Sequence, residues 1–310
     1  MVLEYQGCYI ATPSSLEVVD SSVYPSWCFG FERLEGDFNR YPDIGLDDES
    51  GMMTVINAKS FPQTYYISVS DCAAVKLADG SDALEVCKTF HGNSYVTFIL
   101  LLFPKSRIDL CKLVPHSSTG DHKRSMKKML SKIRILSDIQ EFQSAVPQLP
   151  GYNLDLFPLA ANFDGEFLCT QASGGRLTHF AHPSTYHAID FRCPIGTPVL
   201  AIFDCLIVDL RNDSSNSGVH VSDLFNWNSV MIKAIDKDLY CEYVHVKRNS
   251  MRFKIGDMVK KGSIVCETGN VGFCPEPHLH MELHASKEPG AESIPILYEG
   301  LPFKEGTSYP

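Results

Sequence analysis

The chain has 310 residues, of which 44% are hydrophobic and 21% charged, which is enough apolar material for one large domain or two modest ones. Its formal net charge of −10 leaves no excess of basic residues to neutralise a phosphate backbone, which argues against nucleic acid as a main partner. The most apolar stretch, residues 95–103, is half as long as the roughly 18 residues that a membrane-spanning helix requires. We therefore expect two domains and no membrane span.

The first residues and the cysteines bear on the cellular compartment. Glu4, Glu17 and Asp20 occupy the start of the chain, and no lysine or arginine precedes an apolar core, which is the wrong order for a secretory signal. Eleven cysteines are scattered without a C-x-x-C pair, and an odd number cannot all pair within one chain. We expect a cytoplasmic chain with reduced, buried thiols, although delivery outside the cell by another route stays open.

Short β-rich segments make up the first part of the chain. Residues 53–56, 65–69 and 95–103 are rich in β-branched and aromatic side chains and are separated by clusters of Gly, Asp, Asn and Ser. We therefore predict a small β-rich N-terminal domain over residues 1–117, with no recognisable site and an unknown role.

The pattern changes after Ser118. Apolar side chains at 126, 129, 130, 133 and 136 recur at helical spacing with lysines and arginines between them, so one helix is expected. Pro147 and Pro150 would end it, because proline lacks the amide donor. Residues 118–150 are thus predicted to be a linking helix and a Pro-rich linker. Strand patterns return at 198–203 and 228–233, which predicts a second, all-β domain over residues 151–310.

Alternating histidines form the sharpest local feature of the sequence. In the segment from Pro277 to His284, the residues His278, His280 and His284 would point to one face of a strand with period two. The first two could then reach one metal ion or one bound water. Taken alone, this alternation also fits a solvated strand face.

Two further segments support a metal site. Asp190 lies between Ile189 and Phe191 at the start of a segment that should be buried, so its charge needs a partner, and a metal ion is the simplest one. A carboxylate with an imidazole, such as His280, suits zinc. His245 follows Tyr243 and Val244 in another probable strand, where it could be a core or a catalytic residue.

These blocks resemble the lysostaphin/LytM-type zinc endopeptidases, which cut peptide cross-links of bacterial peptidoglycan. The resemblance covers roughly residues 165–290, and three blocks follow the family's order: residues 188–201, residues 243–245, and residues 256–262 leading through Gly269-Asn270 to His280. It implies the duplicated hybrid motif fold, an antiparallel β-sandwich. It also implies that Asp190 and His280 are zinc ligands and that His245 and His278 act as general base and transition-state stabiliser, in an order that stays open.

The remaining zinc ligand implied by the resemblance is a histidine upstream of Asp190. The commonest family pattern places it four residues before the aspartate, but here that residue is Tyr186. A variant pattern has a Ser/Thr-His pair after a stretch with Gln and Gly, and the segment from Thr170 to His179 is similar to it. We expect His179 as the ligand and His182 as the alternative. His187 ranks last, because it would need a bulge to face the metal.

The resemblance implies a zinc metalloendopeptidase that hydrolyses peptide bonds of peptidoglycan stem peptides or cross-bridges by means of a zinc-activated water. The alternative is a catalytically silent zinc-binding, cell-wall-binding or regulatory module of the same fold. Retention of Asp190, His245, His278 and His280 favours the enzyme. A third possibility is that zinc only stabilises the domain while the N-terminal domain binds a partner.

Overall fold

In the computed structural model the regular secondary structure of the described residues is almost entirely strand, and the chain divides into two compact units, Met1–Ala145 and Val146–Pro310. It describes residues 150–310 except 161–164, 176–177 and 180–181. In the first unit it describes residues 2–5, 8–11, 32–33, 44–47, 49–60, 63–70, 72–77, 83–84, 87–88, 94–102, 105–115, 124–125 and 133–137. No helix in the described residues is long and apolar enough to cross a membrane.

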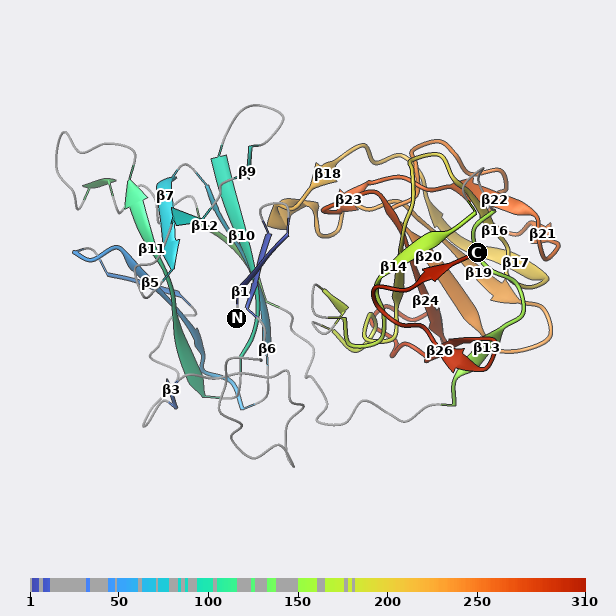
Figure 1. Cartoon of the computed structure of the whole chain (residues 1–310), viewed down its shortest axis with the longest axis horizontal. Coiled ribbons are helices and arrows are strands. Elements are labelled where there is room, and N and C mark those ends of the chain that lie inside the picture. The colour runs from blue at the N-terminus through green and yellow to red at the C-terminus, as the bar shows by residue number, and fades with distance from the viewer. Residues whose placement is uncertain are drawn as a thin grey trace. The chain divides into compact units, whose positions relative to one another are not determined.

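The first unit contains two six-stranded sheets (Figure 1). One has the order β1 (Val2–Tyr5), β2 (Cys8–Ala11), β10 (Ser94–Leu102), β6 (Gln63–Ser70) and β12 (Ile133–Ser137), with β9 (Cys87–Lys88) also pairing with β10. The other has the order β4 (Ile44–Leu46), β5 (Met52–Asn57), β11 (Ser106–Pro115), β7 (Cys72–Leu77) and β8 (Ala83–Leu84), with β3 (Glu32–Arg33) pairing with β11. The segments predicted as strands from composition at 53–56 and 65–69 lie in β5 and β6, and residues 95–102 of the third lie in β10, while residue 103 is outside the described residues.

The predicted linking helix is wrong at residues 133–137. These residues form strand β12, which pairs antiparallel with β6 over Ile133–Ser137 and belongs to the first unit rather than to a linker. Of the rest of the expected helix, only residues 124–125 and 150 lie in the described part of the chain. Backbone pairing with β6 supplies hydrogen bonds distant in sequence, and such tertiary pairing overrides a local helical pattern.

An antiparallel eight-stranded sheet dominates the second unit. Its order is β21 (Met258–Val259), β17 (Cys205–Arg211), β19 (Ser229–Ala234), β20 (Tyr240–Val244), β24 (His278–His284), β15 (Ile189–Arg192), β14 (Phe167–Gln171) and β27 (Ser308–Tyr309). Three small sheets accompany it: β13 (Tyr152–Leu154) with β25 (Ile296–Tyr298) and β26 (Leu301–Pro302), β16 (Pro198–Leu200) with β22 (Ile264–Glu267), and β18 (Ser217–Gly218) with β23 (Gly272–Phe273). A short 3₁₀ turn, η4 (Val221–Asp223), follows β18.

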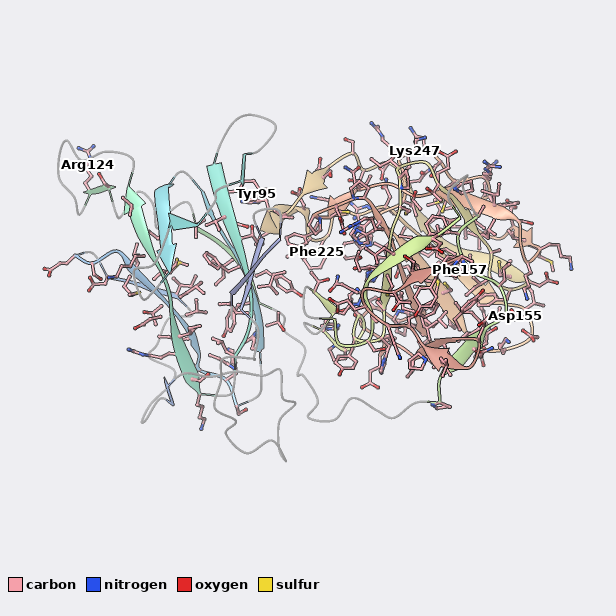
Figure 2. All side chains as sticks on the ribbon, viewed as in Figure 1. Tyr95, Arg124, Asp155, Phe157, Phe225 and Lys247 are labelled. Carbon is pink, nitrogen blue, oxygen red and sulfur yellow. The ribbon has the colours of Figure 1, made fainter. Side chains whose placement is uncertain are left out.

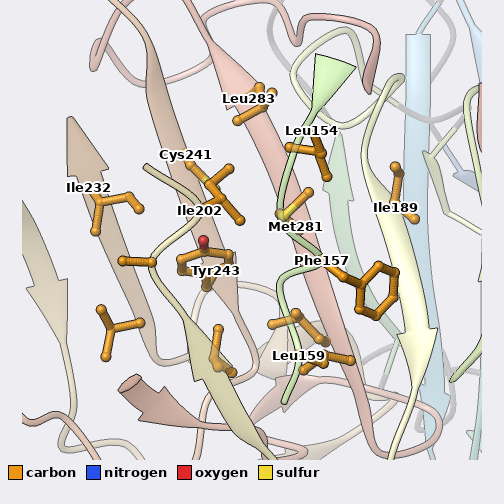
Figure 3. Close-up of a cluster of buried hydrophobic side chains, with 14 of the residues drawn as sticks. Leu154, Phe157, Leu159, Ile189, Ile202, Ile232, Cys241, Tyr243, Met281 and Leu283 are labelled. Atoms are coloured by element: carbon orange, nitrogen blue, oxygen red, sulfur yellow. The ribbon is translucent and has the colours of Figure 1, made fainter. Parts of the chain in front are cut away.

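The core of the second unit gathers buried side chains from the large sheet, from β16 and β22, and from the segments around Leu154 and Ile296 (Figure 3 shows part of it). Leu279, Met281 and Leu283 of β24 are fully buried in it, which leaves the alternate residues of that strand on the opposite face. Tyr243 of β20 crosses the core, and its hydroxyl donates to the Leu200 carbonyl of β16 at 2.8 Å. Charged side chains such as that of Lys247 lie on the outside of this unit (Figure 2). One face of β24 therefore builds the core, and the other is free to build a site.

Candidate metal centre

The central strands align three polar residues in one cross-strand row. Gln171 of β14 pairs with Asp190 of β15, which pairs with His280 of β24, and His280 pairs with Val244 of β20. Side chains of directly paired residues lie on the same face of a sheet. The row thus brings Asp190 and His280, which are distant in sequence, into contact, and it places His245 just beyond the end of β20.

Asp190 is the centre of the cluster. Its Oδ1 atom lies 2.8 Å from His280 Nδ1, 3.2 Å from His179 Nε2 and 3.7 Å from His278 Nε2, and the side chain is 3% exposed. Burial alone would raise the pKa of Asp190, but the three facing histidines hold it well below its usual value. The site therefore carries a buried negative charge that attracts cations.

Two overlapping groups in the described residues have the spacing of metal ligands. In the first, His179, Asp190 and His280 place ligand atoms within 4.8 Å of one another, and in the second, His245, His278 and His280 do so. His182 and His187 belong to neither group. The Nδ1 atom of His182 contacts the Ser184 hydroxyl at 2.7 Å instead.

Hydrogen bonds to the outer nitrogen atoms orient the histidine rings. The Nδ1–H groups of His179, His245 and His278 donate to the carbonyl oxygens of Ala172, Val271 and Glu276, at 3.1, 2.8 and 2.7 Å respectively. A ring whose Nδ1 carries the proton presents the lone pair of Nε2, the state in which imidazole binds a metal or accepts a proton.

His280 is held in the reverse orientation. Its Nε2 lies 3.3 Å from Glu282 Oε2, so Nδ1 faces Asp190. Glu282 in turn contacts His284 Nε2 at 3.1 Å. Burial would raise the pKa of Glu282, but hydrogen bonds with His280 and His284 lower it to about 2. An ionised carboxylate behind a metal-facing imidazole strengthens it as a ligand, so Glu282 supports the site from behind.

His179 provides the test of whether these residues fit a metal. Its Nε2 atom is buried and has no hydrogen-bond partner, although it lies 3.2 Å from Asp190 Oδ1. With the proton on Nδ1, a lone pair on Nε2 faces an anionic oxygen, and such an arrangement is unfavourable unless a cation lies between the two atoms. The buried lone pair and the two-histidine, one-carboxylate set fit a divalent metal ion such as zinc.

His245 and His278 stand beside this set. Their ring centroids are 4.7 Å apart, and the centroid of His245 is 6.0 Å from that of His280. His245 has φ of 62°, a left-handed conformation that is uncommon for residues other than glycine and that recurs at functional sites. Burial lowers the pKa of His245 to about 3, so its ring is neutral.

Comparison with known proteins identifies the family that this part of the chain resembles. The model of peptidase family M23 matches residues 184–291, within which the Asp190, His245, His278 and His280 side chains converge. Residues 184–291 are a peptidase family M23 domain. His179 lies ahead of the matched residues, so the family match does not bear on its role as a ligand.

The M23 domain is similar to several named proteins. It is 30% identical over 97 residues to the glycyl-glycine endopeptidase ALE-1 of Staphylococcus capitis, covering 31% of this chain and 24% of that protein. An uncharacterised metalloprotease of Buchnera aphidicola is 32% identical over 105 residues, covering 34% and 24% of the two chains. This chain thus spans about a quarter of the length of these relatives.

Among solved structures, the chain is similar to the catalytic domain of the prophage-encoded M23 protein EnpA from Enterococcus faecalis. The identity is 30%, the TM-score is 0.32, and the match covers 44% of this chain and 93% of that one. The catalytic domain of lysostaphin from Staphylococcus simulans is 25% identical, with a TM-score of 0.29 and coverage of 41% and 86%.

The sequence left several parts of the centre unassigned. The three carbonyl oxygens that orient His179, His245 and His278 carry no side-chain signal, because any residue type supplies a carbonyl. Gln171, which contacts Asp190, was part of the stretch that resembled the family variant, but its role was not expected. The polar alternation of β24 could have indicated Glu282, since it continues the histidine face.

Proposed function

We propose that the M23 domain is a zinc metalloendopeptidase that hydrolyses peptide bonds in peptidoglycan stem peptides or cross-bridges. The observation that carries the proposal is the convergence of His179, Asp190 and His280 on one point, with His245 and His278 beside it. Three protein ligands leave an open position on zinc, the arrangement of catalytic rather than closed structural sites. The relatives include a glycyl-glycine endopeptidase and lysostaphin, which supports glycine-containing peptides as substrates.

The residues divide into two sets. His179 Nε2, Asp190 Oδ1 and His280 Nδ1 would hold the zinc ion, which supplies a Lewis acid for the scissile carbonyl and lowers the pKa of water toward about 7. His245 and His278 present Nε2 toward the same point, because Nδ1 of each donates to a backbone carbonyl. One can accept the proton of the attacking water and pass it to the leaving amine, while the other supports the developing oxyanion.

The test is release of free amines from purified peptidoglycan by the zinc-loaded protein near neutral pH. Glycine-bridged and directly cross-linked peptidoglycans should be compared, since only the first offers a glycyl-glycine bond. We expect His245→Asn, which tolerates the left-handed backbone, to abolish release with zinc still bound. We expect His280→Ala to lose both.

The same experiment separates the alternatives. Zinc binding without amine release from either substrate would favour the catalytically silent module. Amine release that survives in His245→Asn and in His278→Ala would contradict the assigned roles. Retained zinc in His179→Ala, together with loss in His182→Ala, would move the ligand to His182.

A further inference from the structure

The Gln171 side chain contacts both Asp190 and the segment that carries His179. Its side chain is 4% exposed, and its Nε2 group donates to Asp190 Oδ2 at 2.5 Å and to the Thr178 hydroxyl at 2.9 Å. Its Oε1 atom accepts a hydrogen bond from the Thr178 backbone N–H at 2.8 Å. Thr178 directly precedes His179, so one amide contacts both the carboxylate ligand and the segment that carries the histidine ligand.

A β-bulge places Gln171 in this position. The register of β14 against β15 runs from Cys169 opposite Phe191 to Gln171 opposite Asp190, so Thr170 is the extra residue. In a regular ladder Thr170 would stand opposite Asp190, and Gln171 would share the core-facing side of Cys169. The bulge therefore turns Gln171 to the metal face, and bulges often redirect a side chain next to an active site.

The two oxygen atoms of Asp190 have different surroundings as a result. Oδ2 accepts from the Gln171 amide, whereas Oδ1 faces His179, His278 and His280. A carboxylate held through one oxygen keeps the other in a fixed direction. Glutamine is suited to this role because its amide can donate two hydrogen bonds and accept one in the same plane.

The loop that carries His179 also closes over Gln171. A Cβ atom at Gly175 would lie 3.0 Å from Gln171 Cβ and 3.1 Å from Oε1, so the loop backbone is in close contact with this side chain. The Gly175 N–H donates to the Ala172 carbonyl at 2.9 Å, and that carbonyl also accepts from His179 Nδ1. Two described residues of the loop, Gly175 and Thr178, therefore contact the Gln171 side chain.

We propose that Gln171 is a positioning residue of the metal centre: it holds Asp190 in a single-oxygen orientation and docks the Thr178–His179 segment beside it. The inference rests on the proposed function for the identity of the metal, but it concerns residues of this chain alone. Without the amide, Asp190 is free to rotate and His179 loses its anchored neighbour, so metal affinity should fall while the sheet remains.

Zinc affinity of the full chain, measured by competition with a chromophoric chelator, tests this role. Gln171→Met keeps a similar volume and loses all three hydrogen bonds, and we expect zinc binding to weaken by about 10- to 100-fold, the range seen for residues that orient metal ligands. Gln171→Glu should weaken it further, because a second carboxylate would face Asp190 Oδ2. Gln63→Met, the same change at a buried glutamine of the first unit, is the matched control and should leave zinc affinity unchanged.

Two further readouts separate positioning from a general loss of structure. Hydrogen exchange at the Thr178 amide should accelerate in Gln171→Met, while exchange in β20 and β24 stays at the wild-type rate. The visible spectrum of the cobalt-substituted protein should change, because a freely rotating Asp190 alters the coordination. If Gln171→Met fails to fold, Gln171→Asn decides, since it keeps an amide but is one methylene too short to span both partners.

The outcomes distinguish this inference from the proposed function. Wild-type zinc affinity in Gln171→Met and Gln171→Asn would overturn the positioning role and leave the metallopeptidase proposal intact. A wild-type chain that binds no zinc would instead contradict the proposed metal centre. Weakened zinc binding without any peptidase activity in the wild type would support the role of Gln171 and contradict only the proposed reaction.

Discussion

Gly269 lies between the two histidines proposed to handle protons, and replacing it tests their placement. A Cβ atom at this position would lie 2.7 Å from the His245 carbonyl oxygen, 2.7 Å from the Lys247 nitrogen and 2.8 Å from the Lys247 Cα atom. Gly269 also forms an isolated β-bridge with His278. All three close contacts are with backbone atoms, so no side chain can rotate away to make room.

The size of the effect follows from these distances. Ordinary van der Waals contact begins near 3.4 Å, so Gly269→Ala requires a displacement of about 0.7 Å in the segment that follows His245. Overpacking of this kind costs about 1 to 3 kcal/mol of stability. Because a misplacement of about 1 Å can reduce a rate by about 10²-fold, we expect kcat/KM to fall by about 10- to 100-fold. Asp190 and His280 lie on other strands, so zinc stoichiometry should be unchanged.

The assay combines peptidoglycan hydrolysis, zinc content and thermal unfolding. Gly45→Ala is the matched control, because its Cβ would meet nothing nearer than Thr54 Cβ at 3.8 Å. Wild-type kcat/KM in Gly269→Ala, together with a normal unfolding temperature, would refute the reasoning, since it would mean that the contact relaxes without moving His245. Loss of zinc would show that the metal ligands depend on this contact as well.

Two further predictions concern the interior of the second unit. Tyr243→Phe removes the hydroxyl that donates to the Leu200 carbonyl, and the midpoint of urea unfolding should fall by an amount corresponding to about 1 to 2 kcal/mol, with an unchanged m-value. Burial, followed by the charge of Glu282, raises the pKa of Glu242 to about 7, above the 4.5 of the unfolded chain. In the folded state Glu242 therefore keeps its proton at pH values at which the unfolded chain has lost it. The free energy of unfolding falls as pH rises from 4.5 through 7. Glu242→Gln should remove this loss and stabilise the protein at pH 8 by about 1 to 2 kcal/mol. This is less than the full free energy of the pKa shift, because Glu242 is only partly buried. Chemical unfolding at pH 5 and pH 8 checks it, and an equal difference between variant and wild type at both pH values would contradict it.

Local sequence patterns predicted which residues of two strands lie on the face of the candidate metal centre. Alternation in the segment from His278 to His284 predicted that its histidines share one side of a strand, and β24 has its apolar residues in the core and its polar residues at the site. A carboxylate between apolar neighbours predicted a buried charge that needs a partner, with a metal ion as the simplest one; Asp190 is buried among histidines, and the metal stays a prediction. The first inference rests on the period of two in strand geometry, and the second on the need of a buried charge for compensation.

Other features depended on contacts that no local pattern records. The segment around Ile133 has a helical distribution of apolar residues, yet it forms β12 because its backbone pairs with β6. The choice of His179 over His182 and His187 stayed a prediction from resemblance. In the structure, His179 belongs to a group of residues whose ligand atoms have the spacing of a metal site, and His182 and His187 do not. A loop has no periodicity from which its side-chain directions could be read.

The sequence by itself determined the chemistry that is available to this protein: an aspartate and several histidines on strands, in an order typical of one peptidase family. Only the tertiary structure decided how these groups act together. Register between β14, β15 and β24, and one bulge at Thr170, set which atoms meet at Asp190. Residue identity is local, whereas register and the direction of a lone pair depend on hydrogen bonds between segments far apart in the chain.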